Sequence, residues 1–347
     1  MTLDQMKAYL QGYDGKEINI MEVCGSHTAA IAKNGIPGML SPRIHLLSGP
    51  GCPVCVTPSA YVDKLIELAD SGKVIVTFGD MIRIPGSKES LSEAKGRGIR
   101  VEMVYSPFDI ISMAKAAADD EFVFAAVGFE TTTPIYALLI EHLIKEEIKN
   151  VKLLTALKTM PGVIDHVMAS GADIDGFIAP GHVSVVTGTG IYKPIAEKYS
   201  IPFGVSGFEG EQLLKALCGI VASVGRGVVH NFYHEAVRDE GNISANEIIN
   251  RYFKEDDAMW RGMGIIPGSG RYLKEEYVSF DAGSFGLNDD EIKNKACRCS
   301  EVLMGKIKPM ECPLFKKVCT PLSPQGACMV SEEGNCHSYL VNGRDDL

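Results

Sequence analysis

The chain has 347 residues, of which 46% are hydrophobic and 22% charged, so it is long and apolar enough for two or three globular domains. Its formal net charge of −10 gives no electrostatic reason to bind nucleic acid or an anionic membrane surface. No apolar run approaches the roughly 20 residues that span a bilayer, and the N-terminus lacks a secretory pattern, so we expect a cytoplasmic protein.

Short apolar runs alternate with amphipathic segments up to about residue 225. A first set of four strands is predicted at residues 18–23, 44–48, 74–78 and 100–105, and a second set at 122–127, 151–157, 175–179 and 202–206. The interleaved helices are predicted at residues 59–71, 109–118, 135–145, 163–169, 192–199 and 211–223. This alternation indicates parallel sheets flanked by helices.

The two sets predict two similar α/β domains, residues 1–117 and 118–225. The polar break at residues 116–121 favours this division over a single eight-stranded sheet. Residues 226–347 are predicted to contain a helical connector, with a helix at 244–254 and an irregular Gly-rich stretch at 262–286, and then a small cysteine-rich C-terminal domain. The last segment has little periodicity and six cysteines, so a metal cluster is expected to hold it together.

The ten cysteines are the unusual feature of the composition. In a reducing compartment such a number is typical of metal ligands or redox thiols rather than structural disulfides. Several chemically active residues directly follow predicted strands, where ligands bind in open α/β sheets. These residues are Cys24, Cys52, Cys55, Asp80, Glu130 and His182.

The first motif, Met-Glu-Val-Cys-Gly-Ser-His-Thr at residues 21–28, puts Cys24 at a strand-to-helix turn. Helix amides stabilise a thiolate at such a turn, and His27 could hold or exchange a proton. A cysteine nucleophile would also suit this position, and so would a buried structural cysteine.

The second motif, Gly-Pro-Gly-Cys-Pro-Val-Cys-Val-Thr-Pro at residues 49–58, contains Cys52 and Cys55. A Cys-x-x-Cys sequence after a strand favours a redox dithiol. Half of a zinc site and a purely structural role are the alternatives, although the chain has no second Cys-x-x-Cys pair to complete a zinc site.

The third motif is a C-terminal array of Cys297, Cys312, Cys319 and Cys336. Four thiolates can hold a [4Fe–4S] cluster or a zinc ion, and the wide intervals lack the close pairs of most zinc sites. Cys299 could replace Cys297 in the set, because spacing alone does not decide between them.

Two further loops are polar. Glu130 lies in Gly-Phe-Glu-Thr-Thr-Thr-Pro, residues 128–134, where Thr133 could cap a helix or the free amides could bind an anion. His182 follows a predicted strand and could be functional or structural. Cys218 lies in an apolar helix and is expected in the core. No Walker or Rossmann glycine motif follows a strand, so nucleotide hydrolysis has no support.

Taken together and in order, these segments resemble the signature blocks of the HypD family of [NiFe]-hydrogenase maturation factors, over residues 17–340. The resemblance implies two α/β domains, a smaller domain that binds a [4Fe–4S] cluster through Cys297, Cys312, Cys319 and Cys336, and a redox dithiol at Cys52 and Cys55. It also implies that Cys24 holds the iron of an Fe(CN)2CO unit.

The same resemblance implies two direct partners, a HypC-type small chaperone and a HypE-type protein that delivers cyanide, and an indirect one, the hydrogenase large subunit. Cys299 and Cys328 lie outside the family's four-ligand spacing. We expect His27 to tune Cys24, and Glu130 and His182 to handle protons or orient ligands. A stand-alone iron–sulfur thiol-disulfide reductase and a zinc-stapled binding module are the alternative functions.

Overall fold

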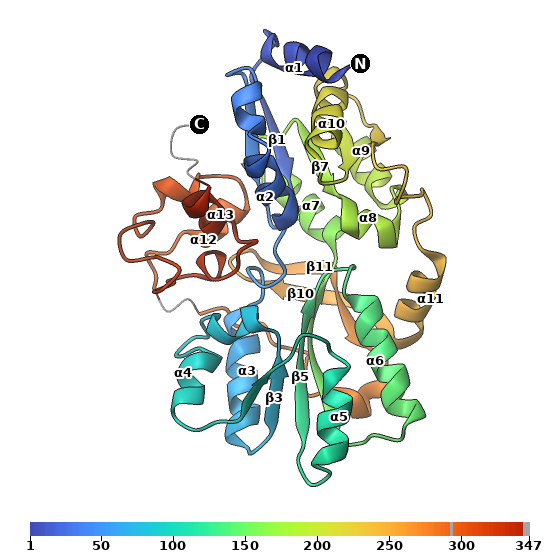
Figure 1. Cartoon of the computed structure of the whole chain (residues 1–347), viewed down its shortest axis with the longest axis vertical. Helices are drawn as coiled ribbons and strands as arrows, with labels where there is room; N and C mark the ends of the chain where they lie inside the picture. Colours follow the sequence, from blue (N-terminus) through green and yellow to red (C-terminus); the bar gives the residue numbers. More distant parts are fainter. Residues whose placement is uncertain (292–293, 343–347) are drawn as a thin grey trace.

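The computed structural model describes residues 1–291 and 294–342, which contain two twisted sheets stacked end to end (Figure 1). Sheet A has five parallel strands in the order β2-β1-β7-β8-β9. Its strands are β1 (Ile18–Glu22), β2 (Ile44–Ser48), β7 (Gly176–Pro180), β8 (Phe203–Ser206) and β9 (Val229–Asn231).

Sheet B has six strands in the order β10-β11-β6-β5-β3-β4. Its strands are β3 (Val74–Thr77), β4 (Val101–Met103), β5 (Phe122–Gly128), β6 (Val151–Lys158), β10 (Phe253–Trp260) and β11 (Gly264–Leu273). The β6-β5-β3-β4 part is parallel, whereas β10 and β11 form an antiparallel hairpin that pairs with β6. The expectation of an α/β protein with helix-flanked sheets is confirmed.

The prediction that each consecutive set of four strands forms its own sheet is wrong. Strands β1 and β2 pair with β7 and β8, while β3 and β4 pair with β5 and β6. The chain therefore leaves sheet A after β2 and returns to it after β6. Buried parallel strands all read as short apolar runs, so the local pattern gives their positions but not their partners. Strand pairing does not test the domain boundaries at residues 117 and 225, which stay predictions.

Helices cover both faces of each sheet, because successive side chains of a strand point to opposite faces. One face of sheet A packs against α1 (Leu3–Gln11), α2 (Gly25–Lys33) and α10 (Gly210–Ala222), and the other against α7 (Met160–Ala169) and α9 (Lys193–Tyr199). One face of sheet B packs against α3 (Ser59–Asp70) and α4 (Leu91–Gly96), and the other against α5 (Asp109–Ala116), α6 (Thr133–Lys145) and α11 (Ile243–Tyr252).

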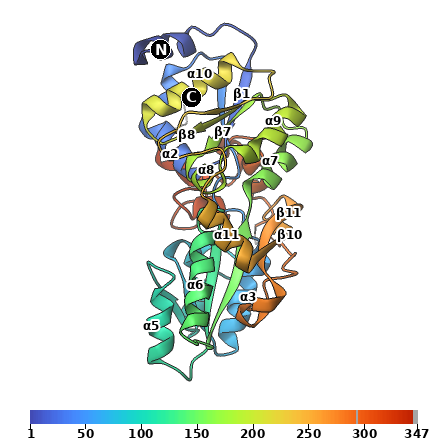
Figure 2. The same ribbon diagram turned by 90° about the vertical axis from the view of Figure 1, so that its right-hand side faces the viewer.

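Two segments contact both the layers around sheet A and those around sheet B. Helix α11 contacts α6 below and the short α8 (Gly181–Thr187) above (Figure 2). The C-terminal segment, with α12 (Cys299–Leu303) and α13 (Asn335–Val341), packs beside α2 (Figure 1). Within the described residues, no helix has the length and apolar character needed to cross a membrane.

The hairpin of β10 and β11 was not predicted from the sequence. Part of it falls in the stretch expected to be irregular, and the predicted helix at 244–254 ends at Tyr252, where β10 begins. Lys254, Glu255 and Asp257 on β10 are exposed. Charged residues are common on edge strands, where they hinder pairing with other chains, and here they hide the apolar alternation.

Candidate functional site

Cys24 lies at the carboxyl end of β1, as predicted, and is the residue before the first turn of α2. Its backbone N–H donates to Glu22 Oε2 at 2.9 Å, and the Thr28 hydroxyl donates to the other oxygen of the same carboxylate. The loop that precedes Cys52 passes very close, since a Cβ on Gly51 would lie 2.2 Å from the Cys24 nitrogen. The first two cysteine motifs are therefore adjacent.

The Cys24 thiol is 9% exposed, and burial raises its pKa to about 12. The backbone amides of His27 and Ser26 act in the opposite direction, as expected of a helix N-terminus, while the charge of Glu22 adds to the rise. Burial outweighs the amides, so the free thiol is protonated at neutral pH. A bound cation would be needed to hold it as a thiolate, which disfavours the alternative of a free cysteine nucleophile.

His27 is completely buried, and its ring is fixed by the turn after β8. Nε2 lies 3.2 Å from the carbonyl oxygen of Ser206 and 3.1 Å from that of Gly207. Because carbonyls only accept, Nε2 carries the proton and Nδ1 is left with a lone pair. Burial lowers the pKa of His27 to about 4, so the ring is neutral. Nδ1 has no hydrogen-bond partner among the described residues.

His182 is brought to His27 by an aromatic ring between them. The Phe208 ring centroid lies 4.7 Å from that of His27 and 4.2 Å from that of His182. His182 is exposed at the start of α8, so the three rings, tilted against one another, form a row from the surface to the buried histidine. Phe208 was not predicted as a site residue. Its only signal in the sequence is that Gly-Phe-Glu follows a strand here, as it does at Glu130.

Glu130 follows β5 in sheet B and is buried, with 6% of its surface exposed. Oε1 accepts a hydrogen bond from the Met160 N–H at 2.8 Å, whereas Oε2 has no partner among the described residues. Burial raises the pKa of Glu130 to about 7, so it can gain or lose a proton near neutrality. Thr133 does not cap α6; it is the first residue of the helix, and its hydroxyl donates to the Phe129 carbonyl.

Tyr192 packs against Phe203 of sheet A and was missed by sequence reasoning. It is fully buried, and its hydroxyl lies 3.3 Å from the Ser184 hydroxyl. Burial raises its pKa, and negative charge on Glu130 or on Cys24 raises it further. Glu130 and Cys24, which extend from different sheets, therefore act on the same phenol.

Cys52 and Cys55 form a compact turn, in which the Cys55 N–H donates to Cys52 Sγ at 3.2 Å. Both side chains are 1% exposed or less, and burial raises the pKa of Cys55 well above its usual value. The Cys55 thiol also lies 3.8 Å from the Ala327 carbonyl oxygen and interacts with the Cys328 thiol. The predicted dithiol is thus in contact with the cysteine-rich segment.

The C-terminal thiols are packed together. Cys297 and Cys299 have their sulfurs 3.2 Å apart, and the Cys299 side chain also interacts with those of Cys328 and Cys336. Cys319 lies close enough to Cys297 and Cys299 to be affected by their charge. Cys299 and Cys328, which the spacing left out, are therefore at the centre of the group.

The group has little free space. A Cβ on Gly326 would lie 2.5 Å from Cys299 Sγ and 2.7 Å from Cys297 Sγ, so a larger residue there would displace the sulfurs. Cys312 is also buried, and its charge acts on Arg298. Among the described residues, no three His, Cys, Asp or Glu side chains are close enough together to hold a single metal ion. Buried cysteines nonetheless provide the donor chemistry of an iron–sulfur cluster, so the residues present fit that cofactor.

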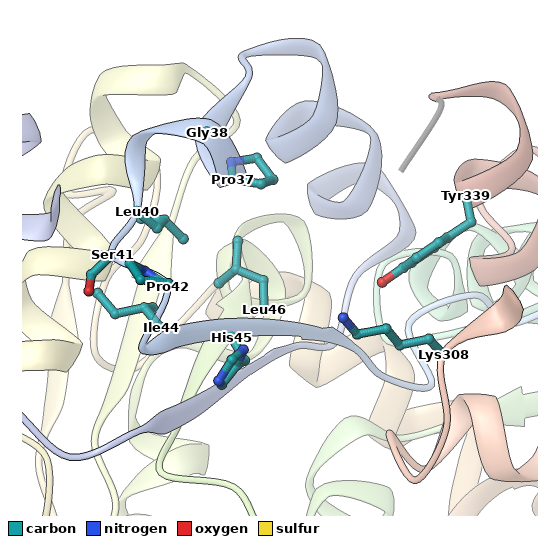
Figure 3. Close-up of a pocket in the computed structure, with 10 residues that line it drawn as sticks. All are labelled: Pro37, Gly38, Leu40, Ser41, Pro42, Ile44, His45, Leu46, Lys308 and Tyr339. Carbon is teal, nitrogen blue, oxygen red and sulfur yellow. The ribbon is translucent and has the colours of Figure 1, made fainter. Parts of the chain in front are cut away.

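A separate pocket of about 470 Å³ opens along the edge strand β2 (Figure 3). It is lined by Pro37, Gly38, Leu40, Ser41, Pro42, Ile44, His45, Leu46, Lys308 and Tyr339. Lys308 and Tyr339 approach from the C-terminal segment, opposite Leu40 and Pro42. No site residue predicted from the sequence lines this pocket.

The fold and the site define an α/β protein with two helix-covered sheets and a C-terminal cysteine-rich region that contacts the strand ends. Residues 2–343 match the HypD family, described as "Hydrogenase formation hypA family". A putative hydrogenase expression/formation protein of Methanocaldococcus jannaschii is 43% identical over 330 residues, which cover 93% of this chain and 91% of that protein.

Two other relatives are called hydrogenase maturation factor HypD. The protein of Rhodobacter capsulatus is 40% identical over 94% of this chain and 90% of its own length. That of Azotobacter vinelandii is 39% identical over 95% of this chain and 90% of its own length. The chain belongs to the HypD family of hydrogenase maturation factors.

Proposed function

We propose that this protein is a cytoplasmic scaffold on which the Fe(CN)2CO unit of the [NiFe] centre is assembled. The observation that carries the proposal is the buried Cys24 thiol, which lies at a strand end beside the dithiol loop and under the cysteine-rich segment. Ser26 donates to Glu333 Oε1 at 2.8 Å, so the turn of Cys24 is bound directly to that segment. One small region therefore combines a candidate iron ligand with the thiols of the proposed redox dithiol.

Cys24 is the proposed ligand of the iron that is being assembled, which is a substrate here and not a resident cofactor. Low-spin iron with cyanide and carbonyl ligands is soft, and a thiolate suits it. Binding would replace the thiol proton, and this proton must leave. The amides of Ser26 and His27 would then favour the thiolate that burial alone disfavours.

The neighbouring polar groups are proposed to position ligands and hold protons. Neutral His27 fixes its ring through Nε2 and keeps Nδ1 available as an acceptor. Glu130, with a pKa of about 7 and one unpartnered oxygen, can hold or release a proton. His182 is exposed and its ring lies against that of Phe208, so we propose that it exchanges protons with solvent.

The dithiol of Cys52 and Cys55 is proposed to be a two-electron redox group. Its oxidation forms one S–S bond and releases two electrons and two protons. A [4Fe–4S] cluster, when held by Cys297, Cys312, Cys319 and Cys336, supplies one-electron transfer next to it. The interaction of Cys55 with Cys328 supports this proximity, because it joins the dithiol loop to the cysteine-rich segment.

The proposed partners follow from the family. A HypC-type chaperone would bring or share the iron, a HypE-type protein would deliver cyanide, and the hydrogenase large subunit would receive the product. The test is infrared spectroscopy of the protein copurified anaerobically with its HypC-type chaperone, which should show bands of iron-bound cyanide and carbonyl. Complexes that bind the chaperone but carry no such bands, after expression with the other maturation proteins, would refute the scaffold function.

A stand-alone thiol-disulfide reductase is the second candidate. The contact of the dithiol with the cysteine-rich segment favours it, but Cys52 and Cys55 are 1% exposed or less, which hinders attack on a protein disulfide. Turnover of disulfide substrates without maturation partners would support the reductase. A zinc-stapled binding module predicts colourless protein that contains zinc, so metal analysis separates it from both.

A further inference from the structure

The turn between β10 and β11 contains a buried arginine with no role in the function proposed above. Arg261 is 4% exposed, and its backbone N–H donates to the Val56 carbonyl at 2.9 Å. Its Nε donates to the Thr57 carbonyl at 2.5 Å, and Nη2 donates to the Pro85 carbonyl at 2.8 Å. Val56 and Thr57 directly follow Cys55, so a single residue holds the segment that leaves the dithiol loop.

An acidic residue completes this contact. Asp290 Oδ1 lies 3.9 Å from Arg261 Nε, and the two side chains are 6% and 5% exposed. Asp290 also accepts hydrogen bonds from the Ser59 N–H at 3.1 Å and the Gly262 N–H at 2.6 Å. The pair therefore ties the dithiol segment to the hairpin, and solvent screens its charges little.

The same turn faces the cysteine-rich segment. A Cβ on Gly262 would lie 2.5 Å from Cβ of Ser300, in the first turn of α12. Ser300 directly follows Cys299, one of the packed thiols, and both residues belong to α12. Arg261 is therefore in contact with the dithiol segment, and its turn packs against the helix that carries Cys299.

We propose that Arg261 is a positioning residue that holds the dithiol segment against the cysteine-rich segment, and that its buried charge raises the reduction potential of the cluster bound there. The inference rests on the proposed function, because it requires a cluster. Reduction adds negative charge to a thiolate-bound cluster, and a nearby cation stabilises the reduced form. Asp290 partly offsets this effect.

The effect of the Arg261 charge on the cluster is tested by a redox titration that is monitored by visible or electron paramagnetic resonance spectroscopy. Arg261→Gln should lower the midpoint potential by about 59 mV, which corresponds to a tenfold change in the equilibrium constant of a one-electron reduction. Arg261→Lys should retain most of the potential, and Asp290→Asn should raise it. Arg251→Gln, which removes an exposed arginine paired with Glu141, is the charge-matched control and should leave it unchanged.

Opposite shifts for the Arg261→Gln and Asp290→Asn variants are not expected from general loosening of the structure. The role of the charge would be overturned if Arg261→Gln and Asp290→Asn had the same potential as the unmodified protein. It would also be overturned if Arg261→Gln and Arg261→Lys lowered the potential by the same amount. If the Gln variant does not fold, the sign of the shift in Asp290→Asn decides alone. An unmodified protein without iron and sulfide would refute the proposed cofactor instead, so the two failures are distinguishable.

The positioning role has its own measurement, the rate at which Cys52 and Cys55 are alkylated in the folded, reduced protein. Arg261→Gln and Arg261→Lys both lose the fork of donors, so both should be alkylated several-fold faster than the Arg251→Gln control. Unchanged rates in both Arg261 variants would show that Arg261 does not hold the dithiol segment.

Discussion

The thiol of Cys55, in the loop after β2, interacts with the thiol of Cys328, in the C-terminal segment. Cys55 also approaches the carbonyl of Ala327, the preceding residue, at 3.8 Å. This contact joins two motifs from distant parts of the sequence.

The C-terminal cysteines should bind one cubane cluster. Anaerobically purified protein is expected to be brown, with about four iron and four sulfide per chain. Cys312→Ala or Cys319→Ala should bleach it and increase proteolysis of residues 294–342, because the cluster would join distant parts of that segment. Cys218→Ala is the control, since that cysteine lies in α10 and contacts the Met6 carbonyl. Full absorbance in both ligand variants would exclude the assignment.

Cys52 and Cys55 should interconvert between dithiol and disulfide as one two-electron couple. Thiol trapping in graded redox buffers is expected to show a single transition, and changing either residue to Ser should abolish it. The turn in which the Cys55 N–H donates to Cys52 Sγ already holds the two residues close together. Independent alkylation of each thiol at every potential would rule out the redox role.

Glu130 should make stability depend on pH. Its pKa is raised from 4.5 to about 7 in the folded protein, so its favourable contribution is complete below pH 4.5 and is lost as the pH rises through 7. The loss relative to Glu130→Gln should be of the order of 3 kcal/mol, measured as the difference in unfolding free energy between pH 4.5 and 8. His27, whose pKa is lowered to about 4, contributes oppositely as the pH falls below 6.5, so only the comparison with the variant isolates Glu130.

Glu209→Gln is the matched control for this experiment, because Glu209 ends the other Gly-Phe-Glu sequence and is exposed. Its stability profile should follow that of the unmodified protein. Parallel profiles for Glu130→Gln and the unmodified protein would mean that the Glu130 carboxyl is not held in its buried, raised-pKa state.

The positions of most elements were predictable, whereas the contacts between them were not. The strand at 122–127 and the helix at 59–71 agree with β5 and α3 within one residue, since apolar periodicity is a local property. The pairing of Ile20 with Gly176 across sheet A depends on distant residues, and no local pattern encodes it. The same reason explains why Cys24 and His27 were found at a strand end while Phe208, Tyr192 and Arg261 were missed.

The central positions of Cys299 and Cys328 among the thiols were also not predictable from the sequence. Their intervals carry no information about which sulfurs meet, and only the folded segment brings Cys299 to Cys297, Cys328 and Cys336. The four predicted ligands remain a prediction from the family spacing, because thiol contacts alone do not select four of the six cysteines.

Cys24 should be required for the assembled iron and not for the resident cluster. Cys24→Ala is expected to keep its iron, sulfide and visible spectrum, because the predicted cluster ligands lie in the C-terminal segment. The purified complex with the small chaperone should lose the infrared bands of iron-bound cyanide and carbonyl. Cys218→Ala, another buried cysteine, should retain them and controls for the loss of a thiol as such.

The simplest rival role for Cys24, that of a nucleophile, is disfavoured by its burial. Burial raises its pKa to about 12, so almost no free thiolate is present at neutral pH to attack a carbamoyl or acyl donor. A nucleophile would instead leave a covalent adduct on Cys24 that mass spectrometry detects under denaturing conditions. Infrared bands at full strength in Cys24→Ala would show that Cys24 is not a required ligand. The iron would then be held by the chaperone alone or by another group of this site, of which His27 Nδ1, buried and without a partner among the described residues, is the first to test.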